Sequence, residues 1–95
     1  MTGGEIKTVE QEMTIKNRFG IHARPAALIV KTVSQFASDV TISREEMIAS
    51  GKSIMGLLTL EGYQGAVLKV TAVGPDADEV IAALQDLVES KFFED

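Results

Sequence analysis

The 95-residue sequence contains no cysteine and no tryptophan, and it has a single histidine and a single tyrosine. A chain without cysteine forms no disulfide, no thiolate metal site and no cysteine nucleophile. No apolar run approaches the ~20 residues of a membrane span, and the first residues lack the charged and apolar regions of a signal peptide. We therefore expect a soluble, cytoplasmic protein that does not insert into a membrane.

Basic residues are also scarce, with nine Lys or Arg against 14 Asp or Glu and a net charge of -5. This balance argues against nucleic-acid binding, which normally rests on a basic surface. The positive charge is concentrated in residues 13–52, which carry six Lys or Arg and three acids. This stretch either attracts acidic protein partners or belongs to an ordinary mixed surface.

The only histidine, His22, lies in the segment Gly-Ile-His-Ala-Arg-Pro at residues 20–25, directly before a stretch with helical periodicity. Near neutral pH an imidazole offers a nucleophilic nitrogen without a strong base. A helix start presents unpaired N–H groups that favour an anion, and Arg24 adds a planar cation suited to phosphate. Pro25 suits the first helical turn. The segment indicates a phosphate carrier, and the alternative is a histidine that only caps or packs.

Hydrophobic periodicity predicts seven elements in the order β-α-β-β-α-β-α. They are a strand at 13–16, a helix from 23 to about 37, strands at 39–43 and 47–49, a helix from 53 to about 60, a strand at 66–73 and a helix from 76 to about 88. Asp76 is expected to cap the last helix, with Glu79 completing a capping box. Residues 1–11 are polar and contain glycine, so we expect a flexible extension before one domain at 12–95. The pattern does not define the order of the strands.

Two motifs stand in a familiar order and spacing: Gly-Ile-His-Ala-Arg-Pro-Ala-Ala at residues 20–27 and Lys-Ser-Ile-Met-Gly at residues 52–56. They resemble HPr, the histidine-containing phosphocarrier family of the bacterial phosphotransferase system, and the resemblance extends from about residue 13 to 91. It implies an α+β fold, an open-faced β-sandwich in which three helices cover one face of a four-stranded antiparallel sheet.

The resemblance also implies a relay function for His22. Enzyme I, charged by phosphoenolpyruvate, would pass a phosphoryl group to the Nδ1 atom of His22, and Arg24 would stabilise its charge. An A-type domain of an enzyme II would then take the group in sugar transport. Such a protein is a transiently phosphorylated carrier and not an enzyme, needs no cofactor and is expected to be a monomer. No carboxylates or histidines occur at ligand spacing, so we expect no metal site.

Ser53 is the second candidate for modification. A serine that starts a short helix is ordinarily its N-cap. The segment from Lys52 to Gly56, however, resembles the site that the ATP-dependent HPr kinase/phosphorylase modifies. A phosphate on Ser53 would place a dianion beside the apolar side chains of Ile54 and Met55. The resemblance therefore implies a regulatory serine that weakens the Enzyme I contact and creates an interface for a transcription regulator.

The helix predicted from residue 53 is apolar on two sides, which suggests a second buried surface besides the core. The predicted partner-binding residues are Phe19, Ile21, Lys52, Ile54, Met55 and Leu58. Phe19 either packs against the domain or contacts partners, and the sequence leaves both open.

Three functions remain open at the level of the sequence. The Ser53 motif favours sugar-linked transport, whereas the ending Phe-Phe-Glu-Asp at residues 92–95 resembles the nitrogen-related branch of the family. A regulatory protein of nitrogen type or corepressor type, acting mainly through protein binding, is therefore the main alternative. A small α/β module that binds a ligand is the third.

Overall fold

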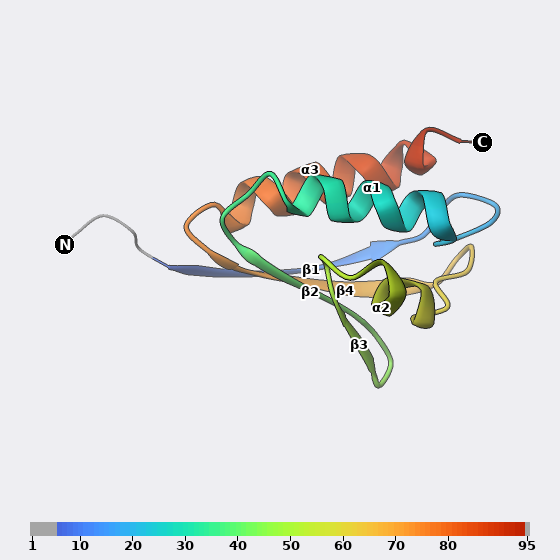
Figure 1. Ribbon diagram of the computed structural model, residues 1–95, viewed down its shortest axis with the longest axis horizontal. Coiled ribbons are helices and arrows are strands. Elements are labelled where there is room, and N and C mark those ends of the chain that lie inside the picture. Colours follow the sequence, from blue (N-terminus) through green and yellow to red (C-terminus); the bar gives the residue numbers. More distant parts are fainter. Residues whose placement is uncertain (1–5, 95) are drawn as a thin grey trace.

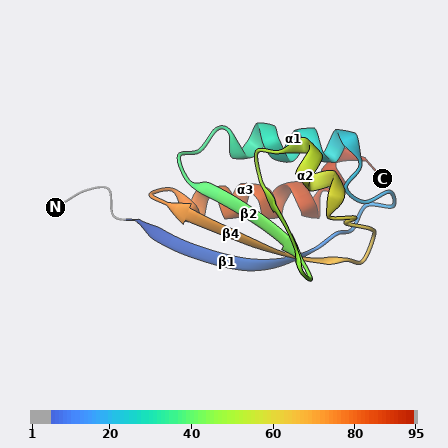
Figure 2. The ribbon, with the colours of Figure 1, turned by 60° about the horizontal axis from the view of Figure 1, so that its bottom comes forward.

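The computed structural model describes residues 6–94 and has the predicted element order, with one short helix added at the end. The elements are β1 (Lys7–Thr14), α1 (Ala23–Val33), β2 (Asp39–Arg44), β3 (Met47–Ser50), α2 (Ile54–Thr59), β4 (Val67–Gly74), α3 (Ala77–Glu89) and the 3-10 helix η1 (Lys91–Phe93). The three α-helices lie on one side of the four-stranded sheet (Figures 1 and 2). The predicted α+β open-faced β-sandwich is confirmed.

The sheet has the strand order β1-β4-β2-β3, and every neighbouring pair is antiparallel. The two central strands are therefore β4 and β2. Along β4 the side chains of Leu68, Val70 and Ala72 are buried and alternate with exposed or half-buried ones. This period-two pattern is that of a strand with one face on the core and one face toward water.

The first strand begins earlier than the sequence predicts, at Lys7 instead of Met13. Residues 7–11 pair with β4, with Lys7 opposite Gly74, so the prediction of a flexible extension is wrong for them. The hydrophobic pattern missed this part because most of its side chains are exposed, and its backbone pairing with β4 defines the strand. Residues 1–5 of the predicted extension lie outside the described residues.

The two long helices bury the faces that their periodicity predicts. The buried apolar residues of α1 and α3 are Ala26, Ile29, Val33, Ala77, Val80, Ile81, Leu84, Leu87 and Val88. Helix α1 ends at Val33, four residues before the predicted end at Ala37. Both helices pack against the sheet and against each other, so the hydrophobic core lies between the helix layer and the strands.

Asp76 does not cap α3 in the predicted way. It occupies the N-cap position, but its carboxylate makes no hydrogen bond to its own helix. It accepts hydrogen bonds from the backbone N–H of Ala37 at 2.8 Å and from the N–H and hydroxyl of Ser38 at 2.9 and 2.5 Å. The carboxylate therefore connects the start of α3 to the segment between α1 and β2, which explains why no capping box forms.

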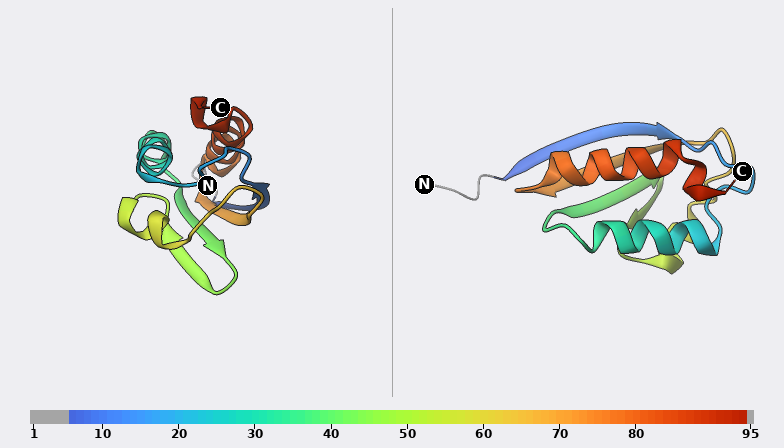
Figure 3. Two further views of the ribbon diagram at one scale, coloured as in Figure 1. Left: turned by 90° about the vertical axis from the view of Figure 1, so that its right-hand side faces the viewer. Right: turned by 90° about the horizontal axis from the view of Figure 1, so that it is seen from above.

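One end of the molecule gathers three segments that are far apart in the sequence. The start of α1, the helix α2 and the C-terminal turn all lie at the end away from the first residues of β1 (Figures 1 and 3). Within residues 6–94, no helix is long and apolar enough to cross a lipid bilayer. Because the predicted site residues come from these segments, this end of the fold is where their geometry matters.

Candidate functional site

His22 is the N-cap residue of α1 and has an extended backbone conformation, with φ -97° and ψ -168°. Its carbonyl accepts a hydrogen bond from the N–H of Ala26 at 3.0 Å, which begins the helix. Its imidazole makes no capping hydrogen bond and is 42% exposed. The side chain is therefore neither a helix cap nor a fully buried core residue.

The loop before His22 is held by a close backbone approach. Gly20 has a positive φ of 65°, and a Cβ at this position would lie 2.1 Å from the carbonyl oxygen of Gly62. The next residue, Ile21, donates its N–H to the same oxygen at 2.8 Å. Only glycine fits both the dihedral and the space, so Gly20 sets how the chain enters the helix.

Ile21, one of the predicted partner-binding residues, is buried. Its side chain is 6% exposed and belongs to the hydrophobic core. The backbone hydrogen bond to Gly62 turns the residue inward, and its side chain lies against Gly62. The prediction that Ile21 contacts a partner protein directly is therefore wrong. The residue instead supports the loop that carries His22.

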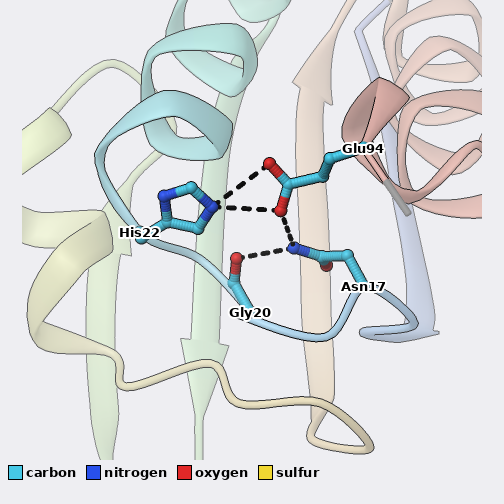
Figure 4. Close-up of polar contacts among 4 residues, drawn as sticks. All are labelled: Asn17, Gly20, His22 and Glu94. Atoms are coloured by element: carbon cyan, nitrogen blue, oxygen red, sulfur yellow. Dashed lines mark hydrogen bonds and ion pairs between the residues drawn. The ribbon is translucent and has the colours of Figure 1, made fainter.

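A carboxylate from the far end of the chain contacts the imidazole. The two oxygens of Glu94 lie 3.0 and 3.2 Å from Nε2 of His22, and the Glu94 side chain is 19% exposed (Figure 4). The other ring nitrogen, Nδ1, lies on the side of the ring away from Glu94 (Figure 4) and makes no hydrogen bond within residues 6–94. The two ring nitrogens therefore have different surroundings.

Asn17 connects this carboxylate to the loop. It is fully buried, and its side-chain amide donates to the carbonyl of Gly20 at 2.8 Å and to Glu94 at 2.9 Å (Figure 4). Its own oxygen, Oδ1, is buried without a hydrogen-bond partner. One side chain thus fixes the loop before His22 and the acid that faces the imidazole.

The charges around Glu94 keep it ionised. The hydrogen bond from His22 holds the pKa of the Glu94 carboxyl below its ordinary value, and the hydrogen bond from Asn17 lowers it further. The positive charge of Arg24 acts in the same direction. Arg24 lies in the first turn of α1 and is exposed to solvent. Its guanidinium therefore acts on Glu94 while it remains accessible.

Ser53 is the N-cap of α2, as predicted. Its hydroxyl oxygen accepts a hydrogen bond from the N–H of Gly56 at 3.0 Å, and the residue is half-buried. A Cβ on Gly56 would lie 3.0 Å from this same oxygen, so the glycine gives the cap its room. The serine therefore has a structural role in the unmodified protein.

The predicted partner-binding residues divide into exposed and packed ones. Phe19, Met55 and Ile54 are 68%, 75% and 40% exposed, and Lys52 is exposed as well. Leu58 is instead half-buried and packs against the core. We name Phe19, Ile54, Met55 and Tyr63 the apolar surface of the site.

Phe19 both packs and remains accessible. Its ring meets the imidazole of His22 edge-on, with centroids 6.2 Å apart, and the guanidinium of Arg18 lies 5.6 Å from its centroid. Tyr63 is 60% exposed and lines a hollow of about 230 Å³ together with Phe19 and Glu61. Large apolar side chains that remain exposed are typical of a protein-binding surface.

Sequence reasoning missed three of these residues. No sequence motif singles out Asn17 or Tyr63. Glu94 was noted within the C-terminal motif but not connected with His22. Within the described part of the chain, no three His, Cys, Asp or Glu side chains gather as they would around a metal ion.

The fold and this site define the class of small α+β phosphocarrier domains. The family model described as the PTS HPr component phosphorylation site matches residues 9–90. The chain is 40% identical over 87 residues to the phosphocarrier protein HPr of Xylella fastidiosa strain Temecula1, across 92% of this chain and 98% of that protein. The chain belongs to the HPr family of the phosphotransferase system.

Two further relatives extend the comparison. The phosphocarrier protein NPr of Shewanella violacea is 38% identical over 86 residues, across 90% of this chain and 94% of that protein. The crystal structure of HPr from Thermoanaerobacter tengcongensis superimposes with a TM-score of 0.87 at 47% identity, across 92% of this chain and 98% of that chain. The fold is therefore that of HPr, and relatives of this chain include proteins named HPr and NPr.

Proposed function

We propose that the protein accepts a phosphoryl group from phospho-Enzyme I on Nδ1 of His22 and gives it to the A-type domain of an enzyme II. The observation that carries the proposal is the asymmetry of the imidazole: Nε2 faces Glu94, while Nδ1 makes no hydrogen bond among residues 6–94. A neutral ring that holds its proton on Nε2 has its lone pair on Nδ1, where it attacks phosphorus.

The surroundings of Nδ1 suit a transferring phosphoryl group. The first turn of α1 has backbone N–H groups without helical partners, and the helix is 11 residues long. Arg24, in the same turn, supplies a permanent charge and planar donors. Phosphoryl transfer depends mostly on positioning and charge stabilisation, so a partner protein can complete a half-exposed site.

The apolar surface of the site gives such a partner a place to dock. Exposed Met55 and Phe19 offer apolar contacts, and Lys52 is exposed beside the start of α2. A separate hollow of about 280 Å³ is lined by Lys16, Arg18, Gln64 and Lys91, and its basic side chains suit acidic groups of a partner. One chain supplies all of these groups, so the proposal is a monomeric carrier that meets its partners in the cytoplasm.

The test is incubation with Enzyme I and phosphoenolpyruvate. The wild type should gain one acid-labile phosphate, and His22→Ala should gain none. Arg24→Ala should be phosphorylated more slowly, because the cation beside the site is lost. A wild-type protein that stays unphosphorylated, or a His22→Ala variant that still gains the phosphate, would refute the proposal.

We further propose that phosphorylation of Ser53 regulates this transfer. Ser53 lies between exposed Lys52 and the exposed apolar side chains of Ile54 and Met55, so a phosphate there adds a dianion to the docking surface. HPr kinase/phosphorylase with ATP should produce an acid-stable phosphate that Ser53→Ala lacks. Ser50→Ala is the matched control, since it removes a nearby hydroxyl that bonds the N–H of Lys52.

The phosphoserine should slow transfer from Enzyme I and allow binding to a transcription regulator. The measurements are the transfer rate and the regulator affinity of the serine-phosphorylated protein. Unchanged transfer and no regulator binding would remove the regulatory part of the proposal. The histidyl relay would stand unaffected.

A nitrogen-type carrier is the second candidate, favoured by the relative named NPr. We expect a sugar-type and a nitrogen-type carrier each to be charged fastest by the Enzyme I of its own branch. Comparing kcat/KM for phosphorylation by a sugar-type and by a nitrogen-type Enzyme I distinguishes them. A preference of at least tenfold, about 1.4 kcal/mol in transition-state binding, would assign the branch.

A further inference from the structure

The C-terminal turn has an energetically unfavourable backbone conformation. Lys91, Phe92 and Phe93 have positive φ values of 57°, 55° and 61°, which makes three consecutive left-handed residues, none of them glycine. L-residues with a side chain are disfavoured in this conformation, which normally occurs at single positions. Such outliers persist only where the surrounding structure enforces them, and they concentrate at functional sites.

Packing and hydrogen bonds hold this turn in place. The ring of Phe92 is fully buried in the core, and the N–H of Glu94 donates to the carbonyl of Lys91 at 3.1 Å. The turn follows α3 and brings Glu94 to the imidazole of His22 (Figure 4). A helix that simply continued would carry this carboxylate away from the site.

Asn17, which also holds the Glu94 carboxylate, has a second energetically unfavourable feature. Asn17 is fully buried, yet its Oδ1 has no hydrogen-bond partner. Its amide hydrogens are used on Gly20 and Glu94. A buried acceptor left unpaired is unfavourable and calls for an explanation. Both unfavourable features, the left-handed turn and the unpaired oxygen, occur in the two segments that hold Glu94.

We infer that Glu94 is a positioning residue for His22: its carboxylate holds the Nε2 proton, which leaves Nδ1 as the nucleophile and fixes the ring plane. Asn17 and the turn at Lys91–Phe93 orient Glu94 for this task. The inference rests on the proposed function, because a fixed nucleophile matters only if His22 accepts a phosphoryl group.

The same contact acts during transfer. The lone pair of Nδ1 forms the new bond to phosphorus, the bond between phosphorus and the donor breaks, and its electron pair stays with the donor. The proton on Nε2 does not move, so the phosphorylated ring carries a positive charge that faces the ionised Glu94 at about hydrogen-bond distance. Because the ring keeps this proton, it remains a good leaving group when the acceptor protein attacks phosphorus.

NMR of the unphosphorylated protein tests the contact without any partner. An imidazole N–H in water normally exchanges too fast to be seen, whereas one bonded to a carboxylate is protected. We expect a downfield Nε2–H signal in the wild type and in the control Glu46→Gln, which neutralises an exposed acid in the β2–β3 turn. Glu94→Ala should lose the signal. A signal that survives in Glu94→Ala overturns the inference.

Rapid-quench transfer from pre-phosphorylated Enzyme I tests the consequence. For Glu94→Ala we expect the maximal single-turnover rate to fall about 10- to 100-fold, because the nucleophile loses its orientation. The half-saturating concentration should stay within about two-fold, because the docking surface is untouched. Glu94→Gln keeps an acceptor oxygen and loses the charge, so its maximal rate should lie between those of the wild type and Glu94→Ala.

The outcomes separate this inference from the proposed function. If the wild type is not phosphorylated at all, the proposed function fails, while the Nε2–H signal still reports the contact. If the wild type is phosphorylated and Glu94→Ala reacts at the same maximal rate, the inference is overturned. An effect on the half-saturating concentration alone also overturns it, because Glu94 would then be a docking residue. Thermal unfolding of each variant verifies that the fold is retained.

Discussion

The backbone of Gly20 lies so close to Gly62 that a single added Cβ would stand 2.1 Å from the Gly62 carbonyl oxygen. These two glycines belong to separate loops, one before α1 and one after α2. The contact is completed by the N–H of Ile21, which donates to the same oxygen at 2.8 Å. The position of His22 therefore depends on a loop that carries no part of the histidine motif.

Gly20→Ala should destabilise the protein by about 2–4 kcal/mol, since it combines a left-handed φ with a steric clash against backbone. Equilibrium urea unfolding measures this change. Gly65→Ala is the matched control, because Gly65 also has a positive φ, 91°, but nothing lies within 4 Å of its added Cβ. The control should lose about 1 kcal/mol. Equal losses would show that the approach to Gly62 does not matter.

Asp76 should make stability depend on acid pH. The hydroxyl of Ser38 and the N–H of Ala37 hold the pKa of the Asp76 carboxyl below its ordinary value. A depressed pKa in the folded state contributes stability above the unfolded pKa, and that contribution is lost as the pH falls through the folded pKa. Asp76→Asn should therefore be less stable than the wild type at neutral pH, and the difference should shrink below about pH 4.

Urea unfolding of both proteins between about pH 2 and pH 7 measures this difference. Asp86→Asn is the control, because Asp86 is exposed on α3 and its side chain has no role in the contact to Ser38. A gap between wild type and Asp76→Asn that stays constant at all pH values would contradict the assigned hydrogen bonds.

The carboxyl of Glu94 should titrate below its ordinary range, chiefly because His22 donates a hydrogen bond to it. His22→Ala removes the largest of these interactions, so we expect the pKa of Glu94 to rise toward its ordinary value of 4.5. The contact adds stability above the unfolded pKa and loses it as the pH falls through the folded one. A carbon-detected NMR titration of the side-chain carboxyl follows this shift. A pKa of Glu94 that is the same in both proteins would contradict the contact.

Phe92 and Phe93 should differ sharply although they are neighbours. Phe92 is fully buried and Phe93 is 69% exposed. Phe92→Ala should cost about 3–5 kcal/mol, because it leaves a cavity in the core. Phe93→Ala should change stability by less than about 1 kcal/mol. Thermal unfolding of the two variants provides the comparison, and a similar loss for both would mean that the C-terminal turn is not anchored by Phe92.

The elements with a strong hydrophobic period were predictable from the sequence. Helices α1 and α3 bury the predicted stripes, and the hairpin of β2 and β3 forms where the alternation indicates it. The start of β1 was missed because Lys7–Gln11 pairs through its backbone and exposes most of its side chains. The local hydrophobic pattern indicates only which side chains of a strand are buried. Pairing with β4 depends on the tertiary fold, which this pattern does not describe.

The candidate site was predictable where its residues are contiguous and not where folding joins distant ones. His22, Arg24 and Ser53 lie within local motifs, and the structure puts each at a helix start. Glu94 reaches His22 across 72 positions, through three left-handed residues that no local pattern specifies. Asn17 orients Glu94 through a hydrogen bond across 77 positions, so its role could not be predicted from the neighbouring sequence.

Met55 should serve docking and not stability. Its side chain is 75% exposed on the apolar surface of the site, so Met55→Ser should unfold within about 0.5 kcal/mol of the wild type. The half-saturating concentration for transfer from phospho-Enzyme I should rise about fivefold, as about 1 kcal/mol of apolar contact is lost. The maximal rate should be unchanged, because His22 and Glu94 keep their geometry. Ile48→Ser is the matched control: Ile48 is 71% exposed on the edge strand β3, and its loss should leave transfer as it is. Equal effects of the two substitutions would move the docking surface away from α2.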